Sequence, residues 1–179
     1  CNFGGNFEVT AGAGAAHDLS GAPGWTADYV FQVKTLFKPL ETNGWGMGIA
    51  AGNIQHPQIN PGPNLLGNDY AYLPLSASWS DDLVIMHANL GWLRDKASGR
   101  DQATWGIGTE INRDQRWTWI AESFGSGSGN AYWQAGVRYG VIPGLLQIDA
   151  TFGRPFDNQP DNHWLSFGVR LTPANLLAR

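Results

Sequence analysis

Apolar and polar residues alternate with a period of two along most of the chain, and this spacing puts odd and even positions of an extended segment on opposite faces. Within residues 25–38, for instance, Phe31 and Val33 point to one face, and Gln32 and Lys34 point to the other. The segments that show this pattern are residues 7–14, 25–38, 45–54, 72–79, 84–92, 103–111, 117–122, 132–141, 146–152 and 165–172. They predict an all-β fold of about ten strands.

Tight turns and longer polar connections alternate between the predicted strands. Asn43-Gly44 and Pro143-Gly144 supply the backbone angles that hairpins need. Tight turns are expected at residues 41–44, 80–82, 112–115 and 142–144, and longer connections at residues 16–24, 55–68, 93–101, 125–130 and 154–162. Short turns at one end, long loops at the other and an even strand number are typical of bacterial outer-membrane barrels. We therefore expect a transmembrane antiparallel up-and-down β-barrel with both termini on the periplasmic side.

The distribution of charge between the two faces distinguishes this barrel from a soluble β-sandwich or a lipocalin-like barrel, which would show the same period. A soluble barrel is filled mainly by apolar side chains and is charged outside. Here the apolar face has almost no charge, and Gly, Ser, Thr, Gln and Asn share the other face with the charged residues. Tryptophans near the ends of predicted strands match the aromatic belts at bilayer interfaces. We expect lipid on the apolar face and the barrel interior on the polar face.

The charged residues of the polar face are the candidate functional residues. They are Glu8, Asp28, Lys34, Glu110, Glu122, Arg138, Asp149 and Arg170. As a constriction they would select small solutes by charge, as rings of side chains do in channels. Alternatively, they form a structural network that fills a narrow barrel, because each buried charge must be paired. Eight strands are already filled by side chains, so about ten leave little free bore.

Length and charge narrow the range of partners. The chain of 179 residues has the size of one domain, so residues 1–179 are predicted to form a single barrel. A net charge of -4 and the lack of a long Lys or Arg run argue against nucleic acid. No stretch of about 18 apolar residues is present, so no transmembrane helix is predicted. The expected partner is outer-membrane lipid, and a second partner from the cell envelope is left open.

Cys1 is the only cysteine, so neither an internal disulfide nor a paired-thiol zinc site is available. A bacterial lipoprotein carries its acyl chains on an N-terminal cysteine, but a cut in a longer chain would also leave one there. Both interpretations stay open. If the chain was cut from a longer one, further strands before Cys1 also remain possible. The histidines match no metal-ligand spacing, and we expect neither a metal nor a cofactor; they are His17, His56, His87 and His163.

The segment YWQAGVRYGVIPGLLQID at residues 132–149 resembles bacterial outer-membrane barrel proteins, in particular the transporter-like outer-membrane group of the phenol-degradation pathway. The resemblance continues through WLSFGVRL at residues 164–171 and covers the last quarter of the chain. It implies the barrel fold and does not identify the cargo. Members of the outer-membrane class usually end in a strand whose last residue is aromatic, whereas this chain ends with PANLLAR at residues 173–179.

Outer-membrane hydrolases built on barrels use a serine, a histidine and an orienting acid. The residues that could form such a group are Ser76, Ser78 and Ser166, His87 and His163, and Glu110 and Asp149. No local motif of those enzymes is present, so we predict no catalytic residue. The leading hypothesis is a narrow channel or transporter for small solutes in the bacterial outer membrane. A plugged structural or partner-binding barrel of an envelope complex is the alternative, and a lipid hydrolase is the third.

Overall fold

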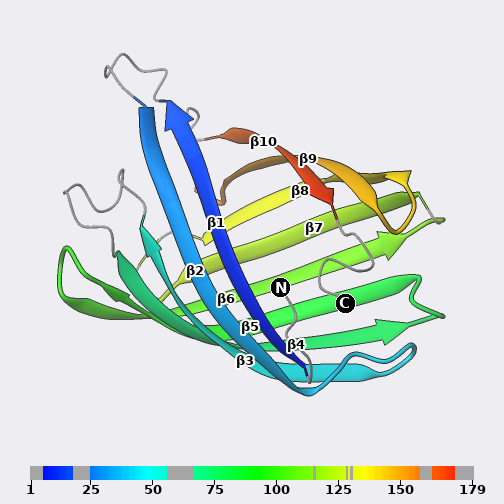
Figure 1. The fold of residues 1–179 in the computed structure, drawn as a ribbon, viewed down its shortest axis with the longest axis horizontal. Helices are drawn as coiled ribbons and strands as arrows, with labels where there is room; N and C mark the ends of the chain where they lie inside the picture. Colours follow the sequence, from blue (N-terminus) through cyan, green and yellow to red (C-terminus); the bar gives the residue numbers. More distant parts are fainter. Residues whose placement is uncertain are drawn as a thin grey trace, which may run out of the picture. The chain divides into compact units, whose positions relative to one another are not determined.

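A computed structural model describes residues 6–17, 25–55, 67–114, 116–127, 129, 131–157 and 163–171. These residues form one antiparallel sheet of ten strands whose order in space follows the sequence (Figure 1). The all-β fold, the up-and-down strand order and the strand number predicted from the period of two are therefore confirmed. Within these ranges, no helix combines the length and the apolar character that would let it cross a membrane.

Most of the strands are longer than the alternating segments from which they were predicted. Their bounds are β1 Phe7–His17, β2 Trp25–Lys38, β3 Trp45–Gln55, β4 Asn68–Trp79, β5 Val84–Asp95, β6 Arg100–Asn112, β7 Trp117–Ser126, β8 Ala131–Ile142, β9 Leu146–Pro155 and β10 Trp164–Leu171.

The chain divides into two compact units, which we describe separately. The first comprises Cys1–Pro39, Gly46–Leu75 and Asn89–Thr104, and the second Leu40–Trp45, Ser76–Ala88 and Trp105–Arg179. In the first unit, β1 pairs with β2 along its whole length, from Phe7 opposite Thr35 to His17 opposite Trp25. In the second unit, β8 pairs with β7 and β9, and β9 also pairs with β10.

Large apolar side chains are exposed, and the residues between them are shielded. In β3, Trp45, Met47 and Ile49 are exposed, whereas the alternate residues Gly46 and Ala50 are buried. Ala50 is the only hydrophobic residue of the described part that is buried. As far as the structure describes the side chains, the sheet therefore has no conventional apolar core on either face, and its apolar face is open to the surroundings.

The predicted closure into a barrel is not observed. Among the described residues, β1 pairs only with β2, and β10 pairs only with β9, so both are edge strands. Closing a sheet requires a particular strand tilt and a particular stagger of the hydrogen bonds. The period of two determines the strands and their faces, but it carries no information about this stagger.

The long connection predicted at residues 93–101 is wrong. β5 continues to Asp95 and β6 begins at Arg100, which leaves only a turn at residues 96–99. The Asp95 carboxylate accepts hydrogen bonds from the backbone N–H of Ala97 and from the hydroxyl of Ser98, and Gly99 takes a positive φ of 66°. These interactions close a tight turn in a polar segment that sequence composition alone indicates as a loop.

Candidate functional site

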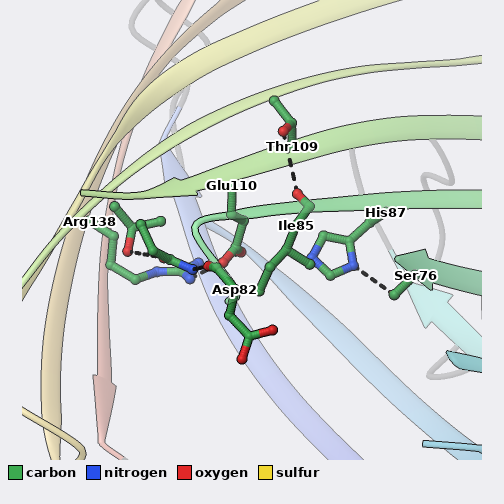
Figure 2. Close-up of polar contacts among 9 residues, drawn as sticks. Ser76, Asp82, Ile85, His87, Thr109, Glu110 and Arg138 are labelled. Atoms are coloured by element: carbon green, nitrogen blue, oxygen red, sulfur yellow. Dashed lines mark hydrogen bonds and ion pairs between the residues drawn. The ribbon is translucent and has the colours of Figure 1, made fainter. Parts of the chain in front are cut away.

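An ion pair between Glu110 of β6 and Arg138 of β8 is the central contact on the polar face of the second unit (Figure 2). Nη1 of Arg138 lies 3.1 Å from Oε1 of Glu110, and the side chains are 24% and 25% exposed. In the sheet order β7 lies between these strands, and its Thr118 is opposite Arg138. The long arginine side chain therefore spans one strand to reach the acid, which favours a charge-assisted hydrogen bond shielded from most solvent.

A second polar chain runs through Glu122, Gln134 and Trp164 of the same unit. The amide nitrogen of Gln134 donates to the carboxylate of Glu122, and the indole N–H of Trp164 donates to the Gln134 carbonyl oxygen over 3.3 Å. The Trp164 ring also contacts Phe124 and Tyr132, with ring centroids 6.4 Å and 6.0 Å away. Polar and aromatic side chains thus fill this part of the face together.

The other predicted charges are not brought into pairs with one another in the residues that the structure describes. Asp149 is opposite Arg138 in the backbone register and opposite Gly168, on which a Cβ atom would lie 2.5 Å from Oδ2 of Asp149. No ion pair joins Asp149 to Arg138 or to the exposed Arg170 in the described residues. Glycine at 168 therefore gives the Asp149 carboxylate its space.

In the first unit, Glu8 and Lys34 are opposite each other in the β1–β2 register. Glu8 accepts a hydrogen bond from the hydroxyl of Thr10 over 3.3 Å, and no ion pair with Lys34 is formed in the described part. Asp28 lies in β2 opposite Gly14, and its side chain is outside those that the structure describes. Of the eight charged residues predicted from the sequence, Glu110 and Arg138 are thus the two that form an ion pair with each other in the described structure.

One of the serine–histidine combinations considered from the sequence is present. Oγ of Ser76 in β4 lies 2.7 Å from Nδ1 of His87 in β5 (Figure 2). A serine nucleophile also needs a group that orients the histidine and donors that bind an oxyanion. Among the described residues, no acid is hydrogen-bonded to His87. In the described part of the chain, the contact is therefore a hydrogen bond between neighbouring strands without an acid that orients the histidine.

The remaining hydrolase candidates have other partners. Ser78 donates to the carboxylate of Asp82, and Ser166 shares a hydrogen bond with the hydroxyl of Thr151. The ring of His163 stacks on Phe152 with centroids 6.0 Å apart. His56 and the side chain of His17 lie outside the described residues, as does Cys1. In the described part, no group of three His, Cys, Asp or Glu residues could hold a metal ion.

A hydrogen-bond network between two turns of the second unit was not predicted from the sequence. The hydroxyl of Thr42 donates to the Asp82 carboxylate over 2.7 Å, and the amide of Asn43 donates to Asp81 over 2.6 Å. The hydrogen bonds from Ser78 and Thr42 to Asp82 lower the pKa of this carboxyl group. The left-handed φ angles of Asp81 and Asp82, 57° and 65°, could have been suspected from the tolerance of Asp for this conformation.

No role was predicted from the sequence for two tyrosines of the first unit, Tyr70 and Tyr72. The hydroxyl groups of Tyr70 and Tyr72 both donate to the side-chain oxygen of Gln32, over 3.2 Å and 3.0 Å. Their rings are nearly parallel, with centroids 6.2 Å apart. The sequence feature that could have indicated this contact is the spacing of the two tyrosines. They occupy alternate positions on a strand face that is otherwise rich in small polar residues.

No curated protein and no solved structure matches this chain. One family model matches residues 1–172, a range that includes all ten strands. The chain therefore belongs to the family described as "Uncharacterised conserved protein UCP029691".

Proposed function

We propose that this protein is a bacterial outer-membrane β-barrel that acts as a narrow channel or transporter for small solutes. The observation that carries the proposal is the distribution of exposure. Phe31, Leu90 and Phe167 are 54%, 71% and 81% exposed, whereas the side chains of Arg138 and Glu110 are 24% and 25% exposed. This arrangement is the reverse of a water-soluble fold, in which charged groups are outside and large apolar groups inside.

The size of the apolar surface supports a lipid environment. Every strand, from β1 with Phe7 to β10 with Leu165, carries at least one large apolar side chain that is exposed. Removing one such side chain from water is worth about 1.5–3 kcal/mol. A face of this kind would promote aggregation in water, but in a bilayer the hydrocarbon covers it.

The free edges of β1 and β10 are the basis for proposing a closed form in the membrane. Sheet edges with unpaired backbone groups do not occur in the hydrocarbon region, because each unpaired group costs several kcal/mol there. An even number of strands in up-and-down order makes β1 and β10 antiparallel, so they can pair in the usual way. We propose that this pairing closes the barrel, with both termini on the periplasmic side. The resemblance of residues 132–149 to outer-membrane barrels agrees with this.

A plugged structural or partner-binding barrel is the second candidate, and the side chains of the polar face are the reason to keep it. Arg138 spans a strand to reach Glu110, and Trp164 contacts Phe124 and Tyr132 over the same face. A barrel of about ten strands has little space beyond its own side chains. If such contacts cover the whole interior, the protein would not conduct.

Conductance in planar bilayers tests the proposal. We expect discrete current steps from protein that is folded in detergent and migrates differently on a gel before and after boiling. The Glu110→Gln variant removes a negative charge and leaves Arg138 positive, so ion selectivity should shift towards anions. Trp119→Phe on the apolar face is the matched control and should leave the selectivity unchanged. Folded protein without steps would favour the plugged barrel, and protein that never enters lipid vesicles would refute both candidates.

A further inference from the structure

A hollow of about 320 Å³ lies on the first unit, over the strands β3, β4, β5 and β6. The residues that line it are Ile54, Tyr70, Ala71, Tyr72, Asn89, Leu93 and Thr104. All of them except Ala71 occupy the alternate positions of their strands that belong to the polar face. Ile54 and Leu93 are therefore apolar residues on the polar face, as are Val30 and Leu36 of β2, and they give the hollow an apolar part beside its polar groups.

Two glycines and one glutamine fix the tyrosine rings at this hollow. A Cβ atom on Gly52 would lie 2.6 Å from the hydroxyl oxygen of Tyr70, and one on Gly91 would lie 2.8 Å from Cβ of Tyr72. Only glycine leaves the space that these side chains occupy. Because both hydroxyl groups donate to Gln32, the rings are held in place before any ligand arrives, which reduces the entropy lost on binding.

The lining determines the chemistry of the ligand. Among the described residues, no lining side chain carries a charge at neutral pH, so a charged solute would lose hydration here without gaining an ionic partner in the lining. Ile54, Leu93 and the tyrosine rings offer apolar contact, whereas the amide of Asn89 and the hydroxyl of Thr104 can each donate and accept hydrogen bonds. The volume is near the lower end of ligand pockets, which span about 300–1,000 Å³, and suits one ring.

We propose that this hollow binds a single uncharged sugar ring, whose C–H face lies against the apolar and aromatic side chains and whose hydroxyl groups bond to Asn89 and Thr104. The inference rests on the proposed function, because it names the class of solute that the barrel would carry. It uses the contacts of the first unit alone, so binding can be measured whether or not the protein conducts.

Titration of the full-length protein, folded in detergent micelles, with methyl β-glucoside tests the proposal, with binding followed by saturation-transfer NMR. Asn89→Leu and Thr104→Val should each weaken binding about three- to tenfold, as expected for one lost uncharged hydrogen bond. Thr118→Val makes the same change on the polar face of the second unit and should leave binding unchanged. Glucuronate and glucosamine, which carry opposite charges, should bind more weakly than the neutral glycoside.

Several results would overturn the sugar site. These are no saturation transfer from the folded protein, equal binding of the charged sugars, or equal affinity of the Thr104→Val and Thr118→Val proteins. Current steps without sugar binding would refute this site and leave the channel intact. Sugar binding without current steps would support the site and refute the channel, so the two failures are distinguishable.

Discussion

Replacing Arg138 by methionine keeps much of the side-chain volume and leaves the Glu110 carboxylate without its partner on a face where it is only 25% exposed. Removing one partner of a fully buried ion pair lowers the free energy of unfolding by about 3–5 kcal/mol. An exposed ion pair contributes only about 0.2–1 kcal/mol. The partial exposure of both groups places Arg138→Met between these limits, at about 2 kcal/mol of unfolding free energy. Glu110→Gln should cost less, because an amide can still accept a hydrogen bond from the arginine.

A double-mutant cycle isolates the interaction. Unfolding by urea in lipid vesicles, followed by tryptophan fluorescence, would give the free energies of the parent, both single variants and the double variant. We expect a coupling of about 1–2 kcal/mol between residues 110 and 138. Arg94→Met is the matched control, because its pair with Asp101 is 3.4 Å long and about half exposed, and its loss should cost less than about 0.5 kcal/mol. A coupling below about 0.3 kcal/mol, within the additivity error, would refute the described contact.

Three further predictions concern the apolar face and the turns. Phe31→Arg should destabilise the protein in lipid by about 2–4 kcal/mol if residue 31 lies near the bilayer centre, and Phe31→Leu by much less; equal losses in vesicle unfolding would contradict the lipid contact. Hydrogen bonds from Ser78 and Thr42 lower the pKa of Asp82 below 3.8. The stabilisation of the folded protein by the ionised Asp82 is therefore fully present above the pKa of the unfolded state, and it is lost as the pH falls through the pKa of the folded state. The stability difference between the parent and Asp82→Asn should therefore shrink below pH 3.8 in a pH series of urea unfolding, and a constant difference would argue against these hydrogen bonds. Gly144→Ala should cost about 1 kcal/mol in the same assay, because φ is 76° there, and a neutral effect would mean that the turn is shaped differently.

Hydrophobic alternation was sufficient to predict the strands, because neighbouring residues of an extended chain point to opposite sides whatever the tertiary structure. Trp45, Met47 and Ile49 show this directly, since each is exposed while Gly46 and Gly48 between them are buried. Closure is a different kind of property. It depends on strand tilt and stagger, which no short segment of sequence encodes.

The partners of the polar side chains were also beyond the sequence. Ser76 and His87 could be named as candidates because they share the polar face of successive strands, but their contact depends on the register between those strands. Arg138 had several acids within the predicted face and pairs with Glu110, two strands away, although Asp149 is its direct neighbour in register. The register of neighbouring strands alone therefore does not predict the ion pair.

The orientation of the two faces is most directly tested at adjacent residues of β7. In a Cys1→Ser background, a small fluorescent label would be attached to Trp119→Cys or to Thr118→Cys, and the protein folded into vesicles of lipids with brominated acyl chains. Trp119 is 52% exposed on the apolar face, whereas Thr118 bonds to Asn112 on the polar face. We expect strong quenching of the label at residue 119 and little at residue 118. Equal quenching at both positions, or the reverse order, would contradict the account.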